Sequence, residues 1–496
     1  MRSRTSRRAR TAVLAAFLLA LPVSGTTGRV LAANGAASGI NDETAARADA
    51  PVTTDKDQTE ISVTVYNSNL ALVHDVRQIH LQSGIAPLRF EGVAASINPA
   101  TVHFRSLSEP AKLNVVEQNY EYDLLDAQKL LQKYVGREVT FEVAGVESKA
   151  LLLADNNGPV WKVGNEIVTG LPVSSYRFPE LPGNLYSHPT LVWTLDNRGG
   201  TAQRVEASYL TDNMNWSADY VLTVGRDEKT ADLDGWVTLL NNSGAAYNNA
   251  RLQLVAGEIH RTERQLMAER DVMVKAMSVN APAPPQFQQE GFSEYHLYTL
   301  ERKTSIQDKE SKQISLLSAT SVPVEKYLSV EGQPYYYRNA QGIGNAIPQP
   351  VKVFYRFKNE QKGGLGMPLP AGTVRVYQAD SKGGVQFAGE DTIGHTPKDE
   401  TLKVYVGNAF DVVCERKQTD YKKLGGNLYE MEYQIVLRNH KDAPVTVEVR
   451  EQLGGDWEVV NSNFPSTKLD SSTIGFQIPV EKDGTATLDY RVRVKW

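Results

Sequence analysis

Apolar and polar residues alternate with a period of two through much of this 496-residue chain, most clearly in 429–436 and 445–449. Because successive side chains of a strand point to opposite faces, this period predicts strands with one buried face. Runs of Gly, Asn and Asp separate the strand patterns at intervals of about ten residues, which is typical of antiparallel sandwiches. We therefore predict a mainly β protein built from antiparallel β-sandwich domains.

The stretch 208–257 has a strong strand signal, and much of the chain is predicted to be organised around it. Leu252 and Leu254 alternate there with polar residues, and Trp216 and Tyr220 are predicted to anchor a core at the strand entry. Its three predicted strands are 220–224, 234–240 and 250–256.

One segment, 123–135, follows the helical period instead. Ala127, Leu130, Leu131 and Tyr134 are spaced for one buried face of a short amphipathic helix. Asp126 or Asp123 can cap the start of this helix, and Gly136 can end it. Very short strand patterns with hairpin turns follow over about 137–170, which predicts a small β-barrel-like insertion.

Changes in composition along the chain predict six segments. They are a signal peptide over 1–33, a disordered leader over 34–57, N-terminal β structure over 58–257, a flexible excursion over 258–293, connecting strands and a loop over 294–350, and a C-terminal β-sandwich over 351–496.

The first 33 residues have the order of a secretory signal peptide. Five arginines precede an apolar run over 11–23, and small residues follow at 32–33. The run is shorter than the roughly 20 residues that cross a bilayer, so we expect cleavage rather than a membrane span. Arg7 and Arg8 leave twin-arginine export open beside the general secretory route. The expected location is the periplasm or the exterior, without a lipid anchor because no cysteine stands at the cleavage site.

Cleavage makes the chain more acidic. Residues 1–33 hold six arginines and no acid, so Lys and Arg fall from 53 to 47 against 58 acidic residues, a net charge of −11. We therefore expect no attraction to nucleic acid or to anionic membranes. The single cysteine, Cys414, cannot form an internal disulfide and is predicted to be a buried structural thiol.

Two clusters of carboxylates are candidates for chemistry, although the chain has no HExxH, CxxC, GxSxG or GKS/T motif. Glu390, Asp391 and His395 could bind a metal or transfer protons, but the Gly and Pro around them also favour a simple turn. Glu117 and Glu121 are predicted to share one face of a strand. Paired carboxylates beside aromatic residues resemble glycoside hydrolase sites, and a solvated strand face is the alternative.

The other polar groups indicate no ligand. Asn215, Trp216, Asp219 and Tyr220 are interpreted as a core corner, and no two of the eight histidines sit at ligand spacing. We predict no cofactor and no metal.

Long motifs occupy residues 213–224, 241–257, 366–377, 387–400, 406–413 and 437–449. These motifs resemble a family of exported bacterial proteins catalogued as domain of unknown function 4139. The resemblance runs from about residue 61 to 496. It implies no established reaction, and some relatives are called mucoidy inhibitors, a name that points to the cell envelope and exopolysaccharide. Those relatives carry a coiled-coil segment, whereas this sequence shows no sustained heptads.

Together these features favour an envelope protein that binds or scaffolds a protein or polysaccharide without catalysis. The alternative is a hydrolase of an envelope polysaccharide or other envelope polymer, with Glu117 and Glu121 or Glu390 and Asp391 as its carboxylates. The sequence leaves the oligomeric state open.

Overall fold

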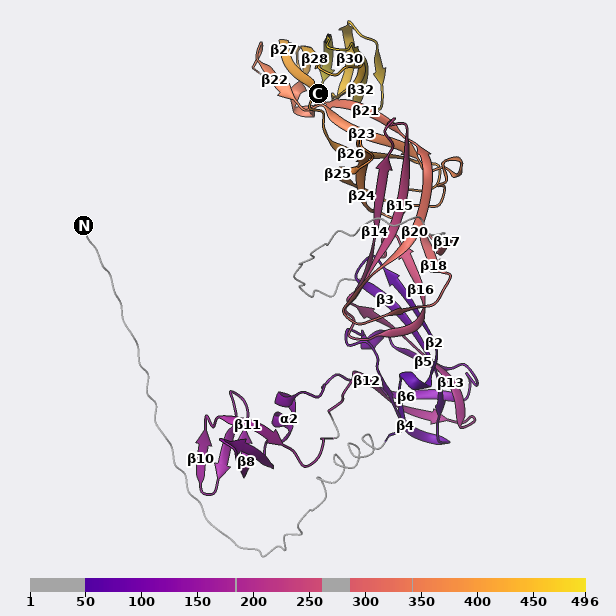
Figure 1. Cartoon of the computed structure of the whole chain (residues 1–496), viewed down its shortest axis with the longest axis vertical. Coiled ribbons are helices and arrows are strands. Elements are labelled where there is room, and N and C mark those ends of the chain that lie inside the picture. Colours follow the sequence, from indigo (N-terminus) through magenta and orange to yellow (C-terminus); the bar gives the residue numbers. More distant parts are fainter. Residues whose placement is uncertain (1–49, 183–184, 261–285, 341) are drawn as a thin grey trace, which may run out of the picture.

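The computed structural model describes residues 50–182, 185–260, 286–340 and 342–496, and within them the chain is mainly β, with six sheets and one α-helix. The sheets around the first core and the C-terminal sandwich follow one another along the long axis of the molecule, and the sheet of the insertion lies to one side (Figure 1). This confirms the predicted fold class. The predicted signal peptide, 34–49 of the predicted leader and 261–285 of the predicted excursion lie outside the described residues.

Three sheets supply most of the first and largest hydrophobic core. A four-stranded sheet has the order β1 (Val52–Thr53), β4 (Gly84–Glu91), β12 (Thr190–Asn197), β6 (Leu113–Glu121). An eight-stranded sheet has the order β17 (Phe287–Phe292), β18 (Tyr295–Leu300), β16 (Tyr247–Ala256), β2 (Gln58–Tyr66), β3 (Leu70–His80), β13 (Ala202–Asp212), β5 (His103–Ser106), with β19 (Thr304–Ile306) beside β16. The central five-stranded sheet has the order β20 (Glu310–Pro323), β15 (Thr230–Asn241), β14 (Met214–Val224), β24 (Gly372–Ala379), β25 (Val385–Ile393).

The predicted strand-rich stretch 208–257 lies at the centre of this core. Every second residue of β14 is buried, including Trp216 and Tyr220, and β14 pairs antiparallel with β15 over its whole length. The third predicted strand, β16, leaves this sheet and pairs parallel with β2 instead. The stretch therefore joins two sheets that face each other across one core.

A second core lies in the C-terminal sandwich. One layer is a six-stranded sheet in the order β26 (Thr401–Asn408), β23 (Lys352–Lys358), β21 (Glu325–Glu331), β29 (Val445–Gln452), β32 (Thr473–Val480), β31 (Ser466–Lys468). The other layer, the C-terminal five-stranded sheet, has the order β22 (Ala346–Gln349), β27 (Val412–Gly425), β28 (Leu428–Asn439), β33 (Thr485–Lys495), β30 (Asp456–Ser462).

The third core belongs to the insertion. There Leu131 of helix α2 (Ala127–Lys133) and Tyr134, the C-cap of this helix, pack with Trp161. Asp126 is the N-cap and accepts a hydrogen bond from the Lys129 N–H at 2.8 Å. The helix is shorter than the predicted 123–135. Its sheet is open, with β10 and β11 at the two edges, so the insertion is not a closed barrel. The sheet order is β10 (Glu166–Thr169), β9 (Val160–Val163), β8 (Val146–Ala154), β7 (Glu138–Val143), β11 (Val173–Arg177).

The predicted disordered leader and the predicted flexible excursion both contain strand residues. At the start, β1 pairs parallel with β4, and the buried Arg77 donates a hydrogen bond to the Thr53 carbonyl at 2.9 Å, so order begins before the predicted residue 58. At 287–292, the end of the predicted excursion is strand β17, because Phe287 is buried and the strand pairs with β18. Short 3-10 turns complete the elements: η1 (Asp55–Asp57), η2 (Pro99–Thr101), η3 (Pro334–Tyr337) and η4 (Gln361–Gly363).

The β24–β25 hairpin is placed differently from the prediction. It falls within the predicted C-terminal sandwich, yet β24 pairs parallel with β14 and so extends the central sheet. Four of the described strand pairs are parallel, namely β1–β4, β14–β24, β16–β2 and β21–β29. Each parallel pair joins strands that are far apart in sequence.

Candidate functional site

Glu390 and Asp391 are consecutive residues of β25, so their side chains point to opposite faces of the strand. Arg375 on β24 links Glu390 (Nε to Oε2, 3.4 Å) to Asp219 on β14 (Nη1 to Oδ1, 2.9 Å). Glu390 thus belongs to a surface ion-pair chain, and the two carboxylates do not form one site.

Asp391 joins two sheets through its carboxylate. One oxygen accepts a hydrogen bond from the Tyr405 N–H on β26 at 2.8 Å, and the other accepts one from the Thr392 N–H at 2.8 Å. Gly389 lies at the same seam, where an added Cβ would be 2.1 Å from the Val406 carbonyl oxygen. These contacts hold β25 of the central sheet against β26 of the six-stranded sheet.

His395 stabilises the turn that follows β25. Its Nδ1 accepts a hydrogen bond from the Ala371 N–H at 3.2 Å. Partial burial lowers the pKa of His395, with a smaller opposing effect of Glu258, so the imidazole is neutral at pH 7. Among the described residues, no three His, Cys, Asp or Glu side chains are grouped to hold a metal ion.

Glu117 and Glu121 lie on one face of β6, at an edge of the four-stranded sheet. Thr194 of β12 donates a weak hydrogen bond to Glu117 at 3.5 Å. The Cα atoms of the two residues are four strand positions, or about 13 Å, apart. Glycoside hydrolases use carboxyl groups roughly 5–9.5 Å apart across a sugar. The pair therefore lacks the spacing of that chemistry.

Of the two aromatic residues beside these carboxylates, Tyr120 is structural and Tyr122 is 71% exposed. Tyr120 donates a hydrogen bond to the Ala95 carbonyl at 3.1 Å, and burial raises the pKa of Tyr120 to about 12. Trp216 and Tyr220 donate hydrogen bonds to the carbonyls of Val255 and Pro370 within the core. The interpretation of Trp216 and Tyr220 as a core corner is correct.

A buried ionic cluster in the C-terminal sandwich was not predicted from the sequence. The side chains of Arg416 and Glu451 are 2% and 0% exposed and form a bidentate ion pair. Tyr337 donates a hydrogen bond to Glu451 at 2.5 Å, and Tyr490 lies 2.7 Å from the Tyr337 hydroxyl. Burial raises the pKa of both tyrosines well above the usual value. The ion pair links β27 of one sheet to β29 of the other and so holds the two sheets together. Because protein groups enclose the carboxylate, the cluster offers no surface to a ligand.

The sequence does contain a signal for this cluster. Arg416 lies two residues after the buried Cys414 on β27, and Glu451 lies two residues after the buried Val449 on β29. Each charged residue therefore occupies an inward position of an alternating strand. Charges at such positions are rarely buried unless they are paired.

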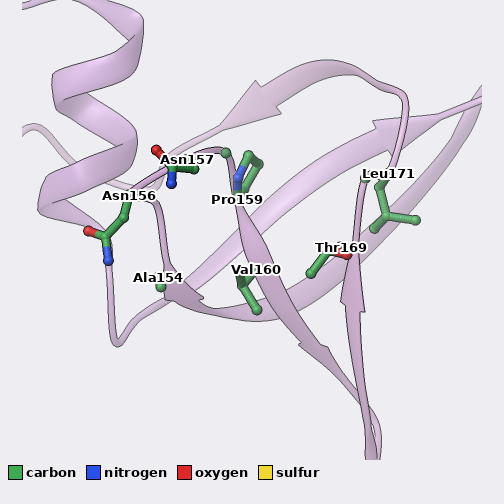
Figure 2. Close-up of a pocket in the computed structure, with 9 residues that line it drawn as sticks. Ala154, Asn156, Asn157, Pro159, Val160, Thr169 and Leu171 are labelled. Carbon is green, nitrogen blue, oxygen red and sulfur yellow. The ribbon is translucent and has the colours of Figure 1, made fainter. Parts of the chain in front are cut away.

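The insertion carries a shallow hollow of about 360 Å³ between its β8–β9 turn and the segment 169–171 (Figure 2). Pro159, Val160 and Leu171 provide apolar lining, and Asn156 and Thr169 provide polar groups. It contains none of the candidate carboxylates. The hollow is remote in sequence from the buried ionic cluster and shares no residue with it.

The family described as Domain of unknown function (DUF4139) matches residues 205–496, so the chain belongs to this family. The match covers β14 to the C-terminus and includes the central sheet and the C-terminal sandwich. No curated protein matches the chain. Among the described residues, no helix has the length and apolar character needed to cross a membrane.

Proposed function

We propose that this chain is an exported protein of the cell envelope that binds or scaffolds an envelope component without catalysis. The observation that carries the proposal is that none of the candidate carboxylates forms a catalytic pair. Asp391 holds a sheet seam, Glu390 belongs to an ion-pair chain, and Glu117 and Glu121 are too far apart for glycoside hydrolysis. The arginine-rich start and apolar run within 1–33 support export.

Export is tested by fractionating bacterial cells that produce the chain with a C-terminal tag. We expect the protein outside the cytoplasm, with an N-terminus that begins just after residue 33. The matched control is Leu18→Arg, which places a charge in the apolar run and should leave the precursor in the cytoplasm. Uncleaved wild-type protein in the cytoplasm would contradict the proposal.

Binding without catalysis is tested with purified mature protein incubated with exopolysaccharide and with peptidoglycan. We expect no soluble product from either polymer. Site-specific photocrosslinking in the envelope is expected to capture one reproducible component. Turnover by the wild type that is lost in Glu117→Ala or Glu390→Ala would identify a hydrolase instead.

A further inference from the structure

Partly exposed aromatic rings gather on one side of the C-terminal five-stranded sheet, near the β27–β28 turn. Tyr429 on β28 and Trp457 on β30 both lie opposite Val494 of β33, and Lys423 of β27 lies opposite Tyr429. Directly paired residues share a face, and Val494 is buried, so this row faces the core side of the sheet. We call the following residues the aromatic end: Tyr421, Tyr429, Trp457 and Trp496, with Arg338, Lys423 and Lys468.

Three rings of the aromatic end, those of Tyr421, Tyr429 and Trp457, pack against the C-terminal core and remain partly exposed. Tyr421 and Tyr429 have ring centroids 6.0 Å apart. The Tyr421 hydroxyl contacts the Arg338 carbonyl, and the Arg338 guanidinium lies 5.3 Å from the Trp496 ring. Trp496 is 36% exposed, and the other three rings are half-buried. Tyr429 and Trp457 are two strands apart, or about 10 Å, so one extended polymer can reach both rings.

Each of the three cations of the aromatic end lies over a ring. Lys423 lies 5.7 Å from the Tyr429 ring, and Lys468 lies 5.1 Å from the Trp457 ring. Within the described part of the chain, Arg338, Lys423 and Lys468 form no ion pair with a carboxylate.

The opposite face of the same sheet is charged but neutralised. Arg491 pairs with Asp420, Glu430 and Glu432, and Arg493 pairs with Glu430 and Glu458. The three cations of the aromatic end differ from these arginines, because they lie over aromatic rings and pair with no carboxylate among the described residues. Cations over half-buried rings remain available to an incoming anion, since cation–π contacts at exposed sites are weak.

We propose that the aromatic end binds an acidic polysaccharide, with sugar rings packed on Tyr429, Trp457 and Trp496 and with carboxylates paired to Arg338, Lys423 and Lys468. Aromatic side chains offer broad apolar area at little entropic cost, and charge-assisted hydrogen bonds add orientation. This inference rests on the proposed function and names the class of envelope component.

The test measures binding of purified mature protein to polygalacturonate, with dextran as a neutral polymer, by affinity electrophoresis. We expect retardation by polygalacturonate alone. Lys423→Ala combined with Lys468→Ala should weaken it at least tenfold, and Trp496→Ala should weaken it severalfold. The matched control is Lys422→Ala, because Lys422 is adjacent in sequence but pairs with Asp420 at 2.6 Å on the other face; its effect should stay below twofold.

The proposal is overturned if polygalacturonate does not retard the wild type, if dextran retards it equally, or if Lys422→Ala weakens binding as much as the double variant. Thermal unfolding of each variant separates a lost contact from a lost fold. If polygalacturonate does not bind while photocrosslinking captures an envelope protein through another surface, this inference is wrong and the proposed function stands.

Discussion

At the scale of single residues, the buried pair of Arg416 and Glu451 is the strictest requirement of the C-terminal sandwich. Removing one partner of a buried ion pair leaves an uncompensated charge and costs about 3–5 kcal/mol. We therefore expect Glu451→Gln to lower the free energy of unfolding by an amount in that range, as measured by urea denaturation.

The control for this change is Glu415→Gln. Glu415 precedes Arg416 on β27 but pairs with Arg438 at the surface, where both side chains are about one-third exposed. Solvent screens such a pair, so the change in stability should be much smaller. Equal effects of the two substitutions would show that the buried pair has no special role.

Cys414 gives a pH-dependent prediction. Burial raises the pKa of its thiol to about 12. The folded protein therefore keeps the proton that the unfolded chain releases above about pH 8.5. The stability due to the neutral thiol is fully present below that pH and declines by up to about 1.4 kcal/mol per pH unit as the pH rises toward 12.

We expect Cys414→Ala to lower stability at pH 7 and to show a shallower loss between pH 9 and 10 than the wild type. Urea unfolding at each pH measures this difference. The wild-type thiol should also resist a thiol reagent at pH 8 until urea unfolds the protein. Rapid reaction of the folded protein would mean that the thiol is accessible.

At the scale of elements, the seam between β25 and β26 joins the central sheet to the six-stranded sheet. A Cβ at Gly389 would overlap the Val406 carbonyl, whereas one at Gly394 would meet nothing within 4 Å. Overpacking of this kind costs about 1–3 kcal/mol. We expect Gly389→Ala to lower the midpoint of thermal unfolding clearly and Gly394→Ala to change it little.

The sequence pattern did not reveal this seam. Around Glu390 and Asp391 it shows carboxylates near an imidazole, which fits a site and a turn equally well. Only the position of β26 against β25 shows that Asp391 accepts the Tyr405 N–H. The spacing of Glu117 and Glu121, in contrast, follows from the period of a strand once β6 is recognised.

At the scale of the whole molecule, the insertion is a separate unit with its own core. The chain enters at Leu125 and leaves at Tyr186, where the Leu125 N–H donates a hydrogen bond to the Tyr186 carbonyl at 2.8 Å. Because the two ends lie side by side, a short Gly-Ser linker can replace 126–185.

We expect this deletion to leave one cooperative unfolding transition with nearly unchanged β-type circular dichroism. The control is a deletion of 372–393, which removes β24 and β25 from the central sheet and should prevent folding. Loss of the fold in the insertion deletion would show that the insertion supports the first core.

The sequence alone determined the local structure of this protein, because alternation, turn residues and helical spacing act over a few neighbours. It predicted the mainly β class, the strands around Trp216 and Tyr220, the short helix, and the burial of Cys414. Only the tertiary structure decided which strands share a sheet, since the partners of β14 and β16 lie far away in sequence and any alternating strand satisfies the local pattern. The same long-range contacts decided that Asp391 holds a seam and that Arg416 meets Glu451.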